Sequence, residues 1–393
     1  MKRRAAQRFA ACLLSGAVLL FLVLLTGCWD AKEVQRLSYI TGLGVDYENH
    51  KFVIYAQMVN FAAIAKEEQQ NAKVKTWVGQ GKGSTVLAAI NDLMSTVSGT
   101  MFLGHVNFLI LTENVFREQM LEKVFDFTNR NKETRYTKWF YGTRGSLFDL
   151  LSAKSFFDRS SLDSQLGDPE QNYAQLSNLK PYYVNEIVAG MLEPSSTVVI
   201  PSMELTDQVW REQNKPMPIF KKSGGFIFNG TQYAGWMKMS DIMQGRWLQS
   251  AYQASPLTLR KNHHSLATIE VKDATHRIEI HEQAGHPRFK VKLKAKGTIM
   301  ELAEQMPLEE IERLAEQTVR NEIMAYYKKG LAMQADLVRL GQTYYRYHPA
   351  RWKKLSVNGR LPLEPSSLEA VDVELLINHA QKYKSPQVKD TYR

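Results

Sequence analysis

One short stretch of the chain, Leu25-Thr26-Gly27-Cys28, has residue types that suit a specific covalent chemistry. The thiol of Cys28 can form a thioether to diacylglycerol, and the small side chains of Thr26 and Gly27 leave room for a peptidase. A basic start, Lys2-Arg3-Arg4, precedes the mostly apolar residues 9–25, which is the usual order in a secretory signal. The pattern predicts a lipoprotein signal peptide over residues 1–27 and lipidation of Cys28.

An uncleaved membrane anchor is the alternative interpretation of this segment. A helix that spans a bilayer usually needs ~20 apolar residues, and the run 9–25 is shorter than that. Cleavage before Cys28 is therefore favoured. Under either interpretation the rest of the chain lies outside the cytoplasm and is held at a membrane.

The two cysteines limit the chemistry of the folded part. Cys12 lies in the predicted signal peptide and Cys28 would be lipidated, and the sequence has no third cysteine. Disulfides, Cys-ligated zinc and a cysteine nucleophile are therefore excluded from the mature fold. Its stability must come from the burial of apolar side chains.

Two other groups of residues suggest chemistry at first sight. The segment Gly79-Gln80-Gly81-Lys82-Gly83-Ser84-Thr85 resembles a phosphate-binding loop, but Lys82 is followed by glycine where Ser or Thr is required. A loop that caps the following helix is the favoured interpretation.

Five histidines lie close together in the sequence: His263, His264, His276, His281 and His286. No two have the helical spacing of a metal-binding pair, so no metal site is predicted.

The sequence has no Gly-x-Ser-x-Gly elbow and no kinase or zincin signature. His105 is interpreted as a structural imidazole. Paired acids for sugar hydrolysis remain open, because their separation is spatial, but nothing singles out a pair. We therefore predict no catalytic residues, no enzyme activity and no cofactor, and an extracytoplasmic hydrolase is poorly supported.

Charge is consistent with a location beside a membrane. The chain of 393 residues has 50 basic and 40 acidic residues. Four of the basic ones, Lys2, Arg3, Arg4 and Arg8, leave with the predicted signal, so the mature chain has a basic excess of 6. Such an excess suits anionic lipid headgroups. Because no dense Lys/Arg run alternates with aromatic residues, nucleic acid is excluded as a partner.

The order of hydrophobic patterns predicts an α+β fold with three mixed α/β domains, each a mainly antiparallel or mixed sheet with packed helices. In the N-terminal domain, residues 28–205, we expect a hairpin of strands 39–46 and 52–59, and further strands at 74–78, 105–111, 136–141 and 198–201. Helices are expected after Ser84 and over 115–127, 147–151 and 182–192, with a long loop at 160–178.

A first domain boundary is expected at 205–218, followed by a small middle domain, residues 216–262. It would contain a hairpin around Asn229-Gly230 and a short helix at 241–249. The C-terminal α/β domain, residues 263–393, is expected to have strands at 266–271, 277–281, 289–297 and 371–377, a long helix at 307–329 and a second helix at 331–340.

Several separated segments resemble the Ger(x)C spore germination lipoproteins. In chain order they are Leu25-Thr26-Gly27-Cys28-Trp29-Asp30, Glu33, 39–46, Gly83-Ser84-Thr85, Gly104-His105, Phe125-Asp126-Phe127 with Arg130, Glu133 and Arg135, Lys222-Ser223-Gly224-Gly225-Phe226-Ile227-Phe228 with Gly235, 297–302, the helix after Pro307, and Ala335-Asp336-Leu337 with Gly341 and Trp352. The resemblance covers nearly the whole mature chain.

This resemblance implies a non-enzymatic C subunit of a nutrient germinant receptor. It would be lipid-anchored through Cys28 to the outer face of the spore inner membrane, and would act by contact with integral-membrane A and B type subunits. A small-molecule ligand stays unknown. The alternative is a solute-binding lipoprotein that delivers a small molecule to a membrane transporter. Its cleft could be lined by aromatic residues such as Trp77, Trp139, Trp210, Trp236 and Trp247.

Overall fold

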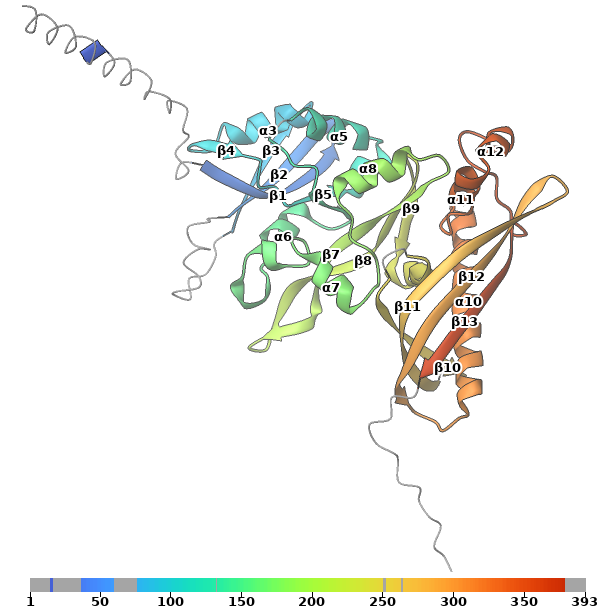
Figure 1. The fold of residues 1–393 in the computed structure, drawn as a ribbon. Coiled ribbons are helices and arrows are strands. Elements are labelled where there is room, and N and C mark those ends of the chain that lie inside the picture. The colour runs from blue at the N-terminus through green and yellow to red at the C-terminus, as the bar shows by residue number, and fades with distance from the viewer. Residues whose placement is uncertain are drawn as a thin grey trace, which may run out of the picture.

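The computed structural model describes residues 15–16, 37–59, 76–131, 133–249, 252–262 and 264–378. Cys28 lies outside the described residues, as does the predicted signal peptide apart from residues 15–16. The described strands form two sheets, and helices pack against both (Figure 1). The predicted combination of mixed sheets with packed helices is confirmed. Within the described ranges no helix is long and apolar enough to cross a bilayer.

The larger sheet has nine strands within these ranges, in the order β3-β2-β1-β5-β6-β7-β8-β9, with β4 paired to β1. The strands are β1 Leu37–Glu48, β2 Lys51–Val59, β3 Thr76–Gly83, β4 Thr100–Phe102, β5 Phe108–Thr112, β6 Trp139–Thr143, β7 Thr197–Glu212, β8 Lys215–Asn229 and β9 Gln232–Lys238. β1, β5 and β6 are parallel. The predicted first hairpin is confirmed, with positive φ at Asn49 and His50 as a type I′ turn requires.

Helices cover both faces of this sheet. On one face lie α3 Val86–Met94, α4 Glu113–Arg117, α5 Leu121–Arg130 and α8 Val184–Leu192, and on the other lies α6 Leu147–Ser152. Along β5, Leu109 and Leu111 belong to the first core, whereas Phe108 and Ile110 belong to the second, because successive side chains of a strand point to opposite faces. Burial on both faces explains the nearly continuous apolar run that predicted this strand.

The glycine-rich segment 79–83 is the end of β3, so the predicted loop is wrong, and Thr85 caps α3 where Ser84 was expected. The glycines are required by close packing, because a Cβ on Gly81 would lie 2.2 Å from the carbonyl oxygen of Ala89 in α3. The high glycine content of β3, which suggested a loop, is therefore explained by the close packing of α3 on this strand.

Two other segments of this half also differ from the prediction. The predicted helix 115–127 is two helices, α4 and α5, and Gln119 between them has a φ of +58°. A positive φ at a non-glycine residue ends a helix. The predicted loop 160–178 contains a helix, α7 Pro169–Gln175, whose first residue is the proline that favours this position.

β7 and β8 form a long antiparallel ribbon that ends in the turn Gln213-Asn214. The ribbon occupies the segment where a domain boundary was expected. β8 and β9 continue the larger sheet, and the predicted short helix at 241–249 is α9 Met239–Ile242 followed by the 3-10 helix η4 Met243–Leu248. The strand after it joins the smaller sheet, so 216–262 contributes to both sheets. The division into three domains stays a prediction.

The smaller sheet has the order β10-β11-β12-β13, from β10 Ala254–Lys261, β11 His264–Gln283, β12 His286–Leu302 and β13 Leu368–Asn378. Its last strand pairs parallel with β12. The predicted strands 266–271 and 277–281 are one strand with an irregularity between Lys272 and Thr275. The long helix, predicted at 307–329, is α10 Leu308–Ala332, and it buries Ile311, Ala315, Val319 and Ile323 against this sheet.

The predicted second helix at 331–340 is wrong. α10 continues to Ala332, and the next helices are α11 Leu340–Tyr347 and α12 Pro349–Leu355. Gln334 and Arg339 both have positive φ, which a helix of L-residues does not accept. The segment between them therefore consists of turns and irregular backbone.

Candidate functional site

The carboxyl ends of three parallel strands meet at one edge of the larger sheet. Asp46 lies near the end of β1, Thr112 ends β5 and Thr143 ends β6. The Asp46 carboxylate accepts hydrogen bonds from the Tyr47 N–H over 2.7 Å and from the Thr112 hydroxyl. Ligand sites in sheets of parallel strands commonly lie at such an edge, so this edge is the first candidate site.

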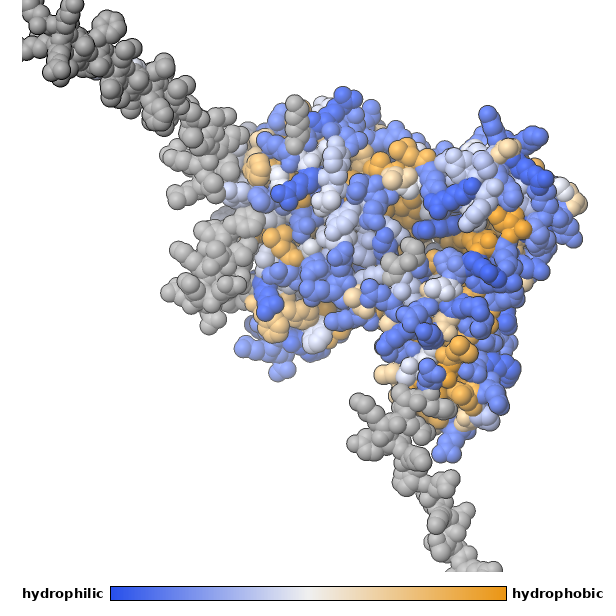
Figure 2. Space-filling model, in the orientation of Figure 1, coloured by the Kyte–Doolittle hydropathy of each residue, from blue (hydrophilic) through white to orange (hydrophobic). Residues whose placement is uncertain are grey.

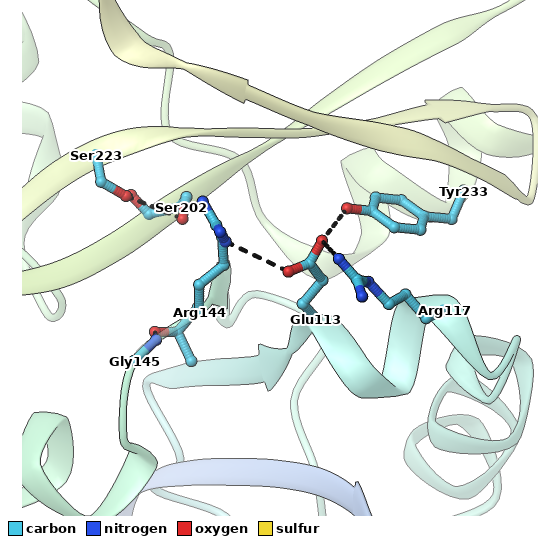
Figure 3. Close-up of polar contacts among 8 residues, drawn as sticks. Glu113, Arg117, Arg144, Gly145, Ser202, Ser223 and Tyr233 are labelled. Carbon is cyan, nitrogen blue, oxygen red and sulfur yellow. Dashed lines mark hydrogen bonds and ion pairs between the residues drawn. The ribbon is translucent and has the colours of Figure 1, made fainter. Parts of the chain in front are cut away.

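Glu113, the residue after β5, lies between two arginines and a tyrosine (Figure 3). The hydroxyl of Tyr233 on β9 donates to Oε1 over 2.7 Å, and Arg117 Nη2 donates to the same oxygen over 3.0 Å. Arg144 Nε lies 3.3 Å from Oε2, and its guanidinium lies over the Trp236 ring, 4.5 Å from the centroid. The carboxylate thus joins α4 to β9 and to the loop after β6.

These contacts fix the protonation states of both groups. Burial raises the pKa of Glu113, but the hydrogen bonds from Tyr233 and Arg117 and the charges of the arginines outweigh it, so the pKa lies below its ordinary value. Burial, and then Glu113, raise the pKa of Tyr233. A general acid must hold a proton near neutral pH and a phenol nucleophile must lose one. Near neutral pH the cluster therefore joins a charged Glu113 carboxylate to a neutral Tyr233 phenol.

A second candidate site is a cavity of about 490 Å³ where the two halves of the chain meet. It is lined by Ser195, Ser196, Thr197, Asn229, Leu331, Gln334, Ala335, Asp336, Gly341, Val357, Arg360, Leu361, Pro362 and Leu363. We call it the joint cavity. The residues up to Asn229 come from the part that builds the larger sheet, and the others come from α10 and the segments after it. Its size lies in the range of small-molecule pockets.

Hydrogen bonds across the joint cavity tie the two halves together. Asn229 Nδ2 donates to the carbonyl of Gln334 over 2.8 Å, and Arg360 Nη2 donates to the carbonyl of Asn229 over 2.8 Å. The Ser195 hydroxyl oxygen accepts from Trp352 Nε1 over 2.8 Å and from the Leu361 N–H over 3.2 Å. The walls of the cavity are therefore held in place by polar contacts between distant parts of the sequence.

Asp336 is the acidic residue of the joint cavity. Its Oδ2 accepts a hydrogen bond from the Gly341 N–H over 2.6 Å, and its Oδ1 is buried without a hydrogen-bond partner. Burial raises the pKa of Asp336 to about 6, against the backbone N–H groups that lower it. A carboxyl group with one unpartnered buried oxygen is a candidate for contact with a cationic or hydrogen-bond-donating group of a ligand.

The histidines singled out in the sequence have different surroundings in the structure. His281 Nε2 lies 2.8 Å from Glu369 Oε2, whereas burial lowers the pKa of His276. The ring of His105 lies 5.1 Å from that of Tyr39 and 5.6 Å from that of Phe102. His263 is outside the described residues. Within the described part of the chain, no group of three His, Cys, Asp or Glu side chains could hold a metal ion.

The five tryptophans suggested for a ligand cleft do not line one pocket together. Trp139 and Trp247 are buried in separate cores, Trp77 and Trp210 are exposed, and Trp236 lies under Arg144. None of them lines the joint cavity.

Sequence reasoning missed Glu113 and Ser195 as residues that join distant elements. Glu113 comes two positions after the apolar run 105–111, so an acidic residue just beyond a predicted buried strand was the available signal. Ser195 has a φ of +56° in a short loop after α8. No sequence pattern indicates that conformation for a serine.

Comparison with known proteins accounts for both halves of the chain. Residues 30–205 match the family model described as "Spore germination protein N-terminal domain", and residues 223–359 match the one described as "Spore germination B3/ GerAC like, C-terminal". The chain belongs to the Ger(x)C family. The resemblance that the sequence suggested is confirmed.

Among the relatives of this Ger(x)C protein are three proteins of Bacillus subtilis (strain 168). Spore germination protein KC is 22% identical over 372 residues, which cover 88% of this chain and 89% of the relative. Spore germination protein B3 is 22% identical, with coverages of 86% and 90%, and spore germination protein A3 is 20% identical, with coverages of 85% and 88%. The crystal structure of the GerBC protein aligns with a TM-score of 0.50 at 17% identity, over 88% of this chain and 99% of that one, which establishes the fold.

The two Ger(x)C models meet in the β7–β8 ribbon, because the first ends within β7 and the second begins within β8. The joint cavity is lined by Ser195 and Thr197 from the first matched region and by Asn229 and Asp336 from the second. The cavity is therefore a feature of the contact between the two parts of the Ger(x)C fold.

Proposed function

We propose that this Ger(x)C protein is a lipid-anchored, non-enzymatic subunit of a nutrient germinant receptor complex. It is needed for spore germination and acts by contact with integral-membrane partners, the A and B type subunits, on the outer face of the spore inner membrane. The observation that carries the proposal is the match of both halves to germination-protein models, together with the lipidation signal at residues 25–28.

The chemistry of the anchor explains how such a subunit works without catalysis. The two acyl chains of a diacylglycerol on Cys28 stabilise membrane binding by ~0.8 kcal/mol per buried CH₂ group. Confinement to the membrane surface raises the effective concentration of the protein near membrane-embedded partners. The Glu113 cluster, with its paired and fixed charges, supports a rigid body that binds and positions other proteins.

The test replaces Cys28 by Ala in spores, with Cys12→Ala in the signal peptide as the matched control. We expect mass spectrometry of the wild type and of the control to find a diacylglyceryl group on Cys28 and a chain that begins there. The Cys28→Ala protein should lack the lipid and should no longer be found in the membrane fraction. Spores that carry this variant should germinate more slowly on the nutrient. Germination of Cys28→Ala spores at the rate of the control would contradict the proposal.

One observation favours a second candidate function, the capture of a small molecule by the joint cavity. Its lining combines apolar side chains such as Leu331 and Leu363 with the polar groups of Asn229, Asp336 and Arg360, which is the usual character of a ligand pocket. A thermal-shift screen of the wild type against amino acids and sugars tests it. Stabilisation that disappears in a Leu363→Trp variant, whose larger side chain fills the cavity, would support this function over the first.

A further inference from the structure

The outer end of the β7–β8 ribbon and the segment beside it expose an apolar surface. Phe157 is 85% exposed and Trp210 on β7 is 52% exposed, and Val209 next to it is also exposed. Figure 2 shows apolar side chains gathered at the lower left of the molecule, where Figure 1 places the ribbon end. Large exposed aromatic residues on neighbouring segments mark a surface that contacts something else.

The backbone holds Phe157 in this exposed position. Its φ is +61°, which places a bulky residue in the left-handed region. Such a conformation is unfavourable for a bulky side chain and persists where the surrounding structure imposes it. The neighbouring ring of Phe156 packs edge-on against Trp210, with 5.2 Å between the centroids. This contact joins the segment of Phe157 to the ribbon, so the two exposed rings lie on one surface.

The same surface surrounds a shallow hollow of about 770 Å³. Its apolar lining includes Phe156, Phe157, Trp210, Pro216, Met217 and Pro218. Its charged lining has three basic residues, Lys154, Arg211 and Lys215, against one acidic residue, Glu212. We call these lining residues the ribbon-end surface. Aromatic rings beside basic side chains are the combination that favours the interface of a membrane with anionic lipids.

The ribbon-end surface is attached to a rigid body. Nearer the sheet, Met203 on β7 and Phe220 on β8 are buried in the core under α6. The outer part of the ribbon extends beyond that core, and its residues from 207 to 216 are exposed. The ribbon can therefore present its aromatic residues without unfolding any part of the sheet.

The position of the proposed anchor limits which surfaces can reach a bilayer. Only residues 29–36 separate Cys28 from the start of β1, and eight or nine extended residues span at most about 30 Å. Figure 1 draws the start of β1 and the ribbon end on the left side of the larger sheet, away from the smaller sheet. In the view of Figure 1 the ribbon end and the start of β1 thus lie on the same side of the larger sheet, β1 above and the ribbon end below.

We propose that the ribbon-end surface is a second membrane contact, in which Phe157 and Trp210 enter the interfacial layer of a bilayer and Lys154, Arg211 and Lys215 face anionic lipid headgroups. This inference rests on the proposed function, since it assumes that the chain lives at a membrane. The lipid at Cys28 keeps the protein at the bilayer, and the ribbon end fixes its orientation there.

The test uses the full-length, membrane-anchored protein with a fluorescent probe at one turn. Gln213→Cys places the probe at the ribbon end, and Ala284→Cys places it at the matched turn between β11 and β12. The mature chain offers no other free thiol, because Cys12 is removed and Cys28 is alkylated in the proposed form. The vesicles consist of phosphatidylglycerol and phosphatidylcholine, and some of their acyl chains carry a nitroxide that quenches fluorescence on contact.

We expect the nitroxide to quench the Gln213→Cys probe at least about threefold more than the Ala284→Cys probe, because interfacial aromatic residues lie at headgroup depth. When Phe157→Gly is added to each labelled protein, the quenching of the Gln213→Cys probe should fall to nearly that of the Ala284→Cys probe. Glycine accepts the positive φ of this position, so the variant loses the ring and keeps the fold, which its melting temperature checks. In vesicles of phosphatidylcholine alone, quenching of the Gln213→Cys probe should fall. Quenching as strong as in the vesicles with phosphatidylglycerol would overturn the assignment to an anionic surface.

Three other results overturn the inference. The first is equal quenching of the Gln213→Cys and Ala284→Cys probes by the lipid nitroxide in protein whose Cys28 is acylated. That result would not contradict the proposed function, because the lipid anchor would still be present. The second is protection of the Gln213→Cys probe from aqueous iodide only at high protein concentration, which assigns the surface to a second copy. The third is protection only when receptor partners are present, which assigns it to a protein. An unmodified Cys28 contradicts the proposed function separately, and quenching of Gln213→Cys by added anionic vesicles would then still support the ribbon contact.

Discussion

The indole Nε1 of Trp352 donates a hydrogen bond to the hydroxyl oxygen of Ser195, 2.8 Å away and 157 positions earlier in the chain. Ser195 follows α8 on the larger sheet, and Trp352 lies in α12, next to the smaller one. Both residues are buried. This single contact therefore links the two parts of the fold at the point where the joint cavity begins.

Replacing Ser195 by Ala should destabilise the whole molecule. It leaves two buried donors, Trp352 Nε1 and the Leu361 N–H, without their acceptor, and unsatisfied buried groups cost about 1–3 kcal/mol each. We expect the free energy of unfolding, measured in denaturant, to fall by about 2–4 kcal/mol. The exposed Ser98→Ala is the control, and equal effects of the two changes would contradict the linking role of Ser195.

Replacing Glu113 by Gln should loosen the contact between α4 and the loop after β6. The amide keeps the shape of the carboxylate but loses its attraction to Arg117 and Arg144. Because the site is partly exposed, we expect a loss of only about 1–2 kcal/mol of unfolding free energy near neutral pH. The control is Glu118→Gln, an exposed acid at the end of the same helix.

The effect of Glu113→Gln should depend on pH in a defined direction. The pKa of Glu113 is lower in the folded state than its ordinary value of 4.5. The stability that the carboxylate contributes is therefore present above that value and is lost as the pH falls through the lower folded pKa. Denaturant titrations should show wild type and variant converging in acid. A constant difference at all pH values would contradict this assignment.

Replacing Asp336 by Asn should make the protein more stable above pH 6. Burial raises the folded pKa of Asp336 from 3.8 to about 6, so the neutral form favours folding. That advantage is fully present below the ordinary pKa and is lost as the pH rises through about 6. The shift corresponds to up to about 3 kcal/mol. An asparagine oxygen can still accept the hydrogen bond of the Gly341 N–H.

Unfolding free energies of wild type and Asp336→Asn, measured on both sides of pH 6, check this prediction. The wild type should lose stability as the pH rises and the variant should not. The exposed Asp372→Asn on β13 is the control, and it should retain the wild-type pH dependence. The same slope in wild type and Asp336→Asn would show that Asp336 titrates normally.

Replacing Gly81 by Ala should separate α3 from β3. The new Cβ would lie 2.2 Å from the Ala89 carbonyl oxygen, which belongs to the helix backbone and cannot rotate away. Overpacking of this kind typically costs about 1–3 kcal/mol, so we expect a lower melting temperature. At Gly145 the nearest atom to an added Cβ is 3.6 Å away. Gly145→Ala is therefore the control, and it should leave the melting temperature nearly unchanged.

Elements with strong periodicity could be predicted from the sequence. The apolar stripe that contains Ile311, Val319 and Ile323, together with the charged ends of the segment, predicted α10 closely, and these three residues are buried. The same holds for the strand at 108–112, whose apolar run is buried on both faces. In these segments a local pattern and the global fold agree.

Elements whose conformation depends on distant contacts could not be predicted. The apolar residues at 331–340 suggested a helix, but the chain there is a turn with positive φ at Gln334 and Arg339, and it is held by the contact of Asn229 with the Gln334 carbonyl. The glycines of β3 suggested a loop because the helix packed on them is invisible to a local pattern. The joint cavity was missed for the same reason, since its walls lie more than a hundred positions apart.

The parallel pairing of β12 with β13 sets the order in which the protein can be completed. Phe289 pairs with Leu368, so the smaller sheet lacks β13 until residues 368–378 have been synthesised. The larger sheet is synthesised in full by Lys238. During translation the first half can fold early, whereas the second half must wait with α10 and one sheet edge uncovered. That interval is when chaperones and proteases will have access to it.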